Sequence, residues 1–127
     1  MGNNNPTGGS PTVSVSGQNV YIAWRAIIAN TSNSEIFFRA SADGGANFGN
    51  PINISNSSRN SDPPKIVASE KNVYILWGDN TAGNYEIFFR ASRDNGANFD
   101  PTINISNSPN FNQIANLATS ENNVYVG

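Results

Sequence analysis

The chain has 127 residues, of which 37% are hydrophobic and 13% are charged, and its formal net charge is −2. This length provides at most one domain. The Lys and Arg residues are scattered singly and no apolar run reaches about 18 residues, so neither nucleic-acid binding nor a membrane span is expected. The chain contains no Cys and no His, which excludes disulfides, thiolate nucleophiles, His-ligated zinc and a Ser/His/Asp triad. No cofactor is expected.

Composition favours strands joined by turns. Ile and Val together number 19 against 2 Leu, and Asn, Gly and Ser interrupt the short apolar runs throughout. Residues 1–10, MGNNNPTGGS, lack a charged segment followed by an apolar one, so they predict no signal peptide. We expect these ten residues to form a flexible N-terminal segment.

The sequence contains an internal duplication. Residues 35–57 align with residues 86–108 at an offset of 51 and are identical at 18 of 23 positions. The register extends outward, because SEKNVYILW from Ser69 matches SENNVYVG from Ser120 at the same offset and SGQNVYIAW from Ser16 at an offset of 53. The two extra residues fall in the loop 25–34, where insertions are least costly.

Each unit is predicted to contain four short strands. The first (12–16, 65–69 and 116–120) has small or β-branched residues that suit a crowded interior, and the second (20–24, 73–77 and from 124) alternates so that Tyr21 and Trp24 face opposite sides. Trp24 and its equivalent Trp77 are expected in the core. The third, EIFFRAS (35–41 and 86–92), is apolar on both faces, so both sides should be covered. The fourth (51–55 and 102–106) points its Ile residues one way.

Four antiparallel strands per unit of about 50 residues are typical of a β-propeller blade. We expect an all-β fold with blade 1 at 11–62, blade 2 at 63–112 and part of a third blade at 113–127. Because a closed propeller needs roughly 4–8 blades, about 2.5 blades predict an incomplete propeller. A β-sandwich of two duplicated halves is the alternative, although it does not require a third strand that is apolar on both faces.

Both units carry the motif S-x-D-x-G-x-x-F between the third and fourth strands. Its residues are Ser41, Asp43, Gly45 and Phe48 in the first copy, and Ser92, Asp94, Gly96 and Phe99 in the second. The motif resembles the Asp-box, or bacterial neuraminidase repeat, of sialidases and of many propellers that are not sialidases, with Phe where Trp is commoner.

The residue types of this motif suit a turn. A carboxylate two residues after the strand end can accept backbone N–H hydrogen bonds from the following turn, Gly permits positive φ, and the aromatic ring can fold back beneath the hairpin. A calcium loop requires several carboxylates at alternate positions, whereas each turn offers one, so no metal site is expected. The two Asp residues are therefore predicted to shape the backbone and to perform no chemistry.

The resemblance also allows a test for a sialidase site, which implies three Arg, a Tyr nucleophile paired with a Glu, and an Asp acid/base from different blades. Residues that recur at blade period cannot converge on one point. These are Arg39 and Arg90, Glu35 and Glu86, Glu70 and Glu121, and Tyr21, Tyr74 and Tyr125. The unrepeated candidates are Arg25, Arg59, Arg93, Asp62, Lys65, Asp79, Asp100 and Tyr85. Arg93 lies in an acidic turn while Arg25 and Arg59 lie in different loops, so convergence is not expected and no catalytic residue is assigned.

The predicted function is that of a non-catalytic scaffold or binding module, which the resemblance places outside the cell or at its surface. One alternative is a carbohydrate-binding, lectin-like propeller with Tyr85, Phe111 and Gln113 as candidate ligand contacts, since loop aromatics and amides stack and hydrogen-bond with sugars. The other is a fragment of an exo-sialidase-like glycoside hydrolase. Expected partners are further copies of the chain, the remainder of a longer propeller, or a glycan.

Overall fold

The structure, a computed structural model, describes residues 7–28, 31, 33–56, 60–80, 86–106, 117–120 and 123–126. The ordered elements of this part are ten strands, and it contains no helix long and apolar enough to cross a membrane. The strands are β1 (Thr7–Ser16), β2 (Asn19–Ile27), β3 (Ser34–Ser41), β4 (Ile52–Asn53), β5 (Lys65–Ser69), β6 (Asn72–Asp79), β7 (Glu86–Ser92), β8 (Ile103–Asn104), β9 (Leu117–Ser120) and β10 (Asn123–Val126).

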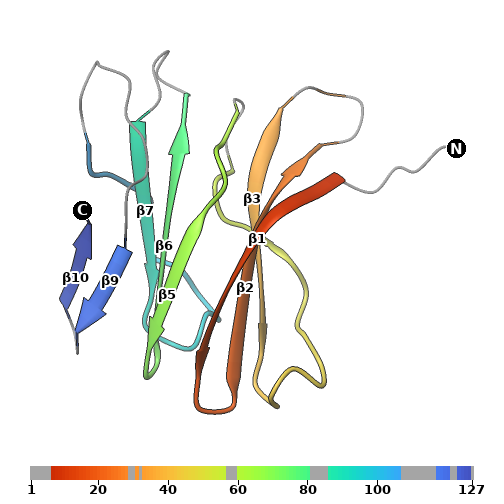
Figure 1. Ribbon diagram of the computed structural model, residues 1–127, viewed down its shortest axis with the longest axis vertical. Coiled ribbons are helices and arrows are strands. Elements are labelled where there is room, and N and C mark those ends of the chain that lie inside the picture. The colour runs from red at the N-terminus through yellow and green to blue at the C-terminus, as the bar shows by residue number, and fades with distance from the viewer. Residues whose placement is uncertain are drawn as a thin grey trace, which may run out of the picture.

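The strands form two four-stranded antiparallel sheets and one hairpin. The first sheet has the order β1-β2-β3-β4, the second has the order β5-β6-β7-β8, and β9 pairs with β10. Figure 1 shows the two sheets side by side, with the β9–β10 hairpin beyond the second sheet and no closure back to the first. The all-β prediction is therefore confirmed.

The duplicated sequence has a duplicated strand register. Trp24 lies opposite Phe37 in the first sheet as Trp77 lies opposite Phe88 in the second. On the other side of the third strand, Phe37 pairs with Asn53 and Phe88 pairs with Asn104. Each repeat therefore builds the same four-stranded unit.

The core lies between the two sheets. The first sheet contributes one set of buried side chains, which are Tyr21, Ala23, Ile36, Phe38 and Ile54. The second sheet contributes Ile66, Val73, Ile75 and Trp77. These residues are fully or almost fully removed from water, and burial of this apolar area is the main force that holds the sheets together.

The two sheets meet through faces that are not equivalent in the repeat. Tyr21 faces the core from β2, whereas its equivalent Tyr74 lies on the outer side of the second sheet, opposite the face of Val73 and Ile75. Each unit therefore has a face that carries the Tyr and a face that carries the Trp, and the Tyr face of the first unit packs on the Trp face of the second.

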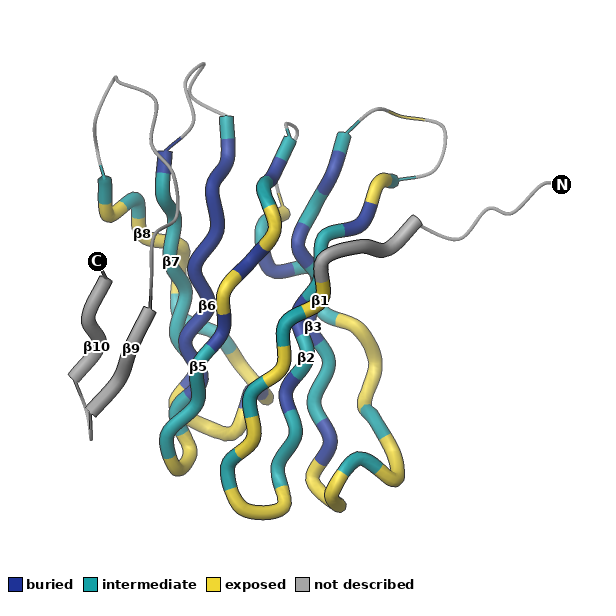
Figure 2. Tube along the Cα trace, viewed as in Figure 1, coloured by how far each residue is buried: buried dark blue, intermediate teal, exposed yellow. Residues whose placement is uncertain are grey.

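This arrangement corrects three expectations. Trp24, predicted in the core, is only half-buried, because the Trp face of the first sheet points outward. For the same reason β1 does not run through a crowded interior, and exposed segments lie along it (Figure 2). Its Val13 and Val15 are 56% and 57% exposed. Likewise Phe37 and Phe89, on the outer faces, are half-buried, so in neither sheet is the third strand fully covered on both sides.

Several strand limits also differ from prediction. β1 begins at Thr7 rather than at residue 12, because β2 continues to Ile27 and offers Thr7 to Gly9 a partner after a register shift between Gly9 and Thr12. β4 and β8 are only two residues long, shorter than the predicted five-residue segments. After β4 the chain turns, because the side-chain oxygen Oδ1 of Asn53 accepts a hydrogen bond from the N–H of Asn56 at 2.8 Å.

Candidate functional site: the acidic turns and a polar cluster at the opposite end

The two copies of the S-x-D-x-G-x-x-F motif, residues 41–48 and 92–99, form the first and second acidic turns. The first turn is closed by hydrogen bonds of its own Ser and Asp. The Ser41 hydroxyl donates to Oδ1 of Asp43 at 2.7 Å and accepts from the N–H of Gly45 at 2.8 Å. Asp43 accepts the backbone N–H of Asn47 on Oδ1 and the side-chain amide of Asn47 on Oδ2, both at 2.9 Å. Both carboxylate oxygens are thus used within the turn.

The second acidic turn repeats these contacts. The Ser92 hydroxyl donates to Asp94 at 2.8 Å and accepts from Gly96 N–H at 2.9 Å, and Asp94 accepts both N–H groups of Asn98 at 2.9 and 3.0 Å. The backbone has positive φ at Asn95 and Gly96 here, as it does at Gly44 and Gly45 in the first turn. This is the hydrogen-bond pattern that the turn interpretation of the two Asp residues predicts.

These hydrogen bonds lower the pKa of both carboxyl groups. The side-chain amide of Asn47, its backbone N–H and the Ser41 hydroxyl lower the pKa of Asp43 from 3.8 to about 2. Asn98 and Ser92 do the same for Asp94, whose pKa is also about 2. Both groups are therefore ionised at neutral pH, and neither has the raised pKa of a general acid that works near pH 7.

Asn47 and Asn98 were not singled out by the motif, although each donates two hydrogen bonds to the carboxylate of its turn. A signal was available, since the tripeptide A-N-F is identical in both copies (residues 46–48 and 97–99). A side chain that donates to the Asp in each repeat is under the same structural demand as the Asp itself.

Arg39 and Arg90 lie on the third strand of their repeats, and each contacts the acidic turn of its own repeat. Arg39 Nε donates to the carbonyl of Gly49 at 2.7 Å, and its guanidinium lies 5.9 Å from the centre of the Phe48 ring. Arg90 Nε donates to the carbonyl of Asp100 at 2.8 Å and stacks over Phe99 in the same way. The two Arg therefore hold aromatic rings and backbone carbonyls, which accounts for their recurrence without a catalytic role.

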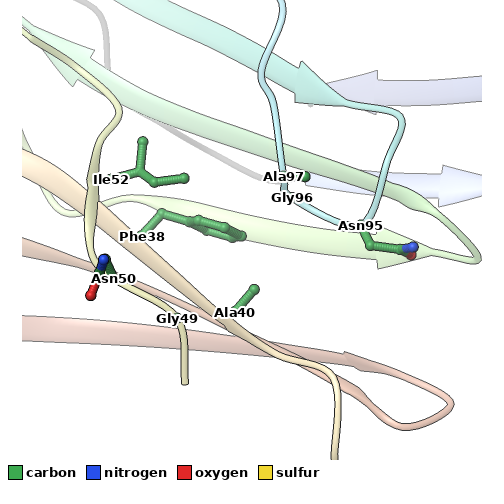
Figure 3. A pocket seen from close by; sticks show the side chains of 8 residues that line it. All are labelled: Phe38, Ala40, Gly49, Asn50, Ile52, Asn95, Gly96 and Ala97. Carbon is green, nitrogen blue, oxygen red and sulfur yellow. The ribbon is translucent and has the colours of Figure 1, made fainter. Parts of the chain in front are cut away.

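A small pocket of about 250 Å³ lies where the second acidic turn meets the first sheet. Figure 3 shows the Phe38 ring pointing from β3 toward Gly96 and Ala97, with the Asn50 and Asn95 amides at the sides. The described residues that line the pocket, among them Ala40 and Ile52, carry no charge. The pocket therefore offers apolar surface and amides but no acid, base or nucleophile.

A polar cluster forms at the end of the sheets opposite the acidic turns. Arg25 Nε donates to the carbonyl of Ser61 at 2.7 Å, and the Ser61 hydroxyl donates to Oδ2 of Asp79 at 2.9 Å. Asp62 lies beside them, and burial raises its pKa, with a further rise from the charge of Asp79 and an opposing effect of Arg25. Ser61 and Asp79 are buried. The structure thus brings together Arg25, Asp62 and Asp79, three of the unrepeated residues of the sequence.

No family model and no curated protein matches the chain.

The other candidates from the sequence lie apart from this cluster or outside the described residues. Arg93 lies on the surface of the second acidic turn, where it forms an ion pair with Asp100 at 3.1 Å. Lys65 is exposed at the start of β5. Arg59 and the candidate ligand contacts Tyr85, Phe111 and Gln113 fall outside the part that the structure describes.

The lowered pKa values predict a specific loss of stability in acid. A carboxyl whose folded-state pKa is depressed stabilises the fold fully above its unfolded pKa near 4, and this contribution is lost as the pH falls toward 2. The double variant Asp43→Asn, Asp94→Asn should unfold at lower urea concentration at pH 7 and should lose less stability than the wild type between pH 4 and pH 2.

Urea unfolding at a series of pH values measures this. Asp100→Asn, which removes an exposed carboxylate from the same region, serves as the control and should leave the acid-dependent loss nearly unchanged. If the double variant and the wild type lost equal stability over this range, the two carboxylates would not hold their turns.

Proposed function

We propose that this chain is a segment of a β-propeller-like repeat protein that acts as a non-catalytic, extracellular scaffold or binding module. The observation that carries the proposal is the stacking of two equivalent four-stranded sheets through different faces, the Tyr face of one on the Trp face of the next. Such a contact can be repeated indefinitely, since each unit presents both faces. Repetition of this kind is how blades and solenoid units build an extended structure.

The state of the acidic turns supports a structural role for the motif. Asp43 and Asp94 are each bonded to donors of their own turn, and the two carboxylates do not share a site. Two carboxylates that act together on a glycosidic bond would have to face a common cleft about 5–10 Å across. The turns are therefore better suited to fixing the β3–β4 and β7–β8 connections than to hydrolysis.

The polar cluster is the place where an enzymatic alternative would have to operate. It contains one Arg and two Asp among its described residues, with Arg25 anchored to a backbone carbonyl and Asp79 to the Ser61 hydroxyl. These contacts join β2, the β4–β5 connection and the end of β6. The cluster therefore has a sufficient structural task, which is to tie the two sheets together at this end.

The proposal is tested with a fluorogenic sialoside and a glycan array. We expect no release of fluorophore above the blank and no selective retention of glycans, while the protein unfolds cooperatively. Turnover that disappears in Arg25→Met would instead establish the hydrolase alternative. Selective retention without turnover would establish the lectin alternative.

A further inference from the structure

The outer face of the first sheet is its Trp face. This face is open, whereas the equivalent Trp face of the second sheet is covered. Val13 is 56% exposed, whereas its repeat equivalent Ile66 is 9% exposed. Trp24 is half-buried, whereas Trp77 is buried. The residues are of the same kind, so the difference comes from the neighbour: the first sheet covers the Trp face of the second, and no described segment covers that of the first.

A second open apolar surface lies over β7 and β8. Ile105 is 39% exposed and Phe89 is half-buried, whereas their equivalents Ile54 and Phe38 are fully buried. β9 contacts β5 on the Tyr face of the second sheet, so the hairpin lies over the part of that face nearest β5 (Figure 1). The strip over β7 and β8, which includes Ile103 at 52% exposure, stays open.

The chain itself contains the contact that joins these two kinds of surface. Between its own sheets, Phe38 of the Tyr face lies edge-on to Phe99 at a centroid distance of 5.0 Å and belongs to the same buried cluster as Trp77. Phe89, the repeat equivalent of Phe38, lies on the open strip. Phe48 and Trp24, the repeat equivalents of Phe99 and Trp77, lie on the outer face of the first sheet. The two open surfaces thus repeat the two halves of a contact already made within the chain.

The two acidic turns also differ in that the second is covered by the neighbouring sheet and the first is open. A Cβ placed on Gly96 would lie 2.6 Å from Cζ of Phe38, so the absence of a side chain at Gly96 lets the ring pack there. Gly45 has the same left-handed backbone, but a Cβ there would meet no atom closer than Val20 Cγ2 at 4.0 Å. The first turn therefore has room for an aromatic ring that the described part of this chain does not supply.

We propose that a second copy of this chain docks head to tail, with its β7–β8 strip on the outer Trp face of the first sheet. Phe89 of one copy then takes the place over Gly45 of the other that Phe38 takes over Gly96 within a chain. The contact joins two different surfaces, so it is heterologous and leaves one open surface at each end of a pair. This inference rests on the repeat stacking of the proposed function and adds the identity of the partner.

Docking also changes the place of the β9–β10 hairpin. In the stacked arrangement, β1 of the receiving copy lies over β5 of the docked copy, on the side of β5 that β9 contacts in the single chain. The two strands compete for the same surface, so assembly releases the hairpin. Amide hydrogen exchange in β9 should therefore become faster in the assembled state.

The test uses one charge on each surface. Val13→Glu places a carboxylate on the outer face of the first sheet, and Ile103→Glu places one on the β7–β8 strip. Both sites are more than half exposed in the single chain, so the fold should tolerate them, whereas burial of an unpaired charge in the contact is strongly unfavourable. Ala42→Glu adds the same charge at an exposed position of the first acidic turn and is the control. The repeat equivalent of Ala42 is Arg93, whose side chain is 75% exposed although the second turn packs on the first sheet, so a charge at residue 42 should stay in solvent in the docked state.

Sedimentation velocity over a range of concentrations gives the result. The wild type and Ala42→Glu should form species larger than the 13.6 kDa chain as concentration rises, whereas each of the other two variants alone should remain monomeric. An equimolar mixture of Val13→Glu and Ile103→Glu should give a dimer and nothing larger, because each variant keeps the surface that the other has lost.

Three results would overturn the inference. The first is a wild type that is monomeric throughout, the second is association that Val13→Glu abolishes but Ile103→Glu leaves intact, which indicates a symmetric contact, and the third is a mixture without dimers. Unchanged exchange in β9 on assembly would also contradict the proposed placement. A monomer that is silent toward sialosides and glycans would overturn this inference alone, whereas turnover or glycan retention would overturn the proposed function.

Discussion

Replacement of Phe38 by Ala is expected to lower the free energy of unfolding by about 3–5 kcal/mol, as is usual for a fully buried Phe. Phe38 is 0% exposed, stacks on Tyr21 at a centroid distance of 6.1 Å and lies edge-on to Phe99. Its removal leaves a cavity between the two sheets, beside the pocket that the ring already lines. Urea unfolding at a concentration where the protein is monomeric measures the loss.

Phe89→Ala is the matched control, because Phe89 occupies the equivalent place in the second repeat and stacks on Tyr74 at the same 6.1 Å. It is only half-buried on the outer strip, so the expected loss is about 1–2 kcal/mol. Equal losses for the two variants would mean that the Tyr face of the first sheet is no better covered than that of the second, which would contradict the stacking described above.

Gly96→Ala is expected to lower the free energy of unfolding by about 2–5 kcal/mol. The left-handed backbone at φ 81° costs a residue with a Cβ about 1–2 kcal/mol. The new methyl group would also overlap the fully buried ring of Phe38, which would have to shift, and this adds about 1–3 kcal/mol.

Gly45→Ala separates these two contributions. Gly45 also has positive φ, at 94°, but a Cβ there enters open space. The expected loss is therefore about 1–2 kcal/mol from the backbone alone. Thermal or urea unfolding of the two variants gives the comparison, and a Gly45→Ala loss as large as that of Gly96→Ala would show that the ring of Phe38 does not lie over Gly96.

The strands and the acidic turns could be predicted from the sequence because they depend on local chemistry. Alternating apolar residues in VYIAW and EIFFRAS specify strands, and Ser41, Asp43 and Gly45 specify a turn whose hydrogen bonds lie within seven residues, 41–47. Duplication made these predictions stronger, since the same pattern had to suit two places in the fold.

The difference between the two copies could not be predicted from the same patterns. Trp24 and Trp77 have nearly the same neighbours in sequence, yet one lies on an open face and the other in the core. What decides this is which face of each sheet receives a neighbour, a property of stacking and not of either repeat. A prediction made from one repeat therefore assigns both residues the same environment.

The polar cluster was missed for a related reason. Arg25, Asp62 and Asp79 lie in β2, in the β4–β5 connection and at the end of β6, and only the stacking of the sheets brings them together. Their lack of repeat equivalents was visible in the sequence and separated them from the residues that serve each unit. That signal identifies residues that connect units, but it does not indicate which of them meet.

The most direct test of the stacking is the nuclear Overhauser effect between the ring protons of Phe38 and the α protons of Gly96. The structure predicts a strong cross-peak, because these groups are in van der Waals contact although they belong to different repeats. A Phe38 ring with cross-peaks only to residues of β2, β3 and β4, and none to Gly96, would contradict the face-to-face packing of the two repeats.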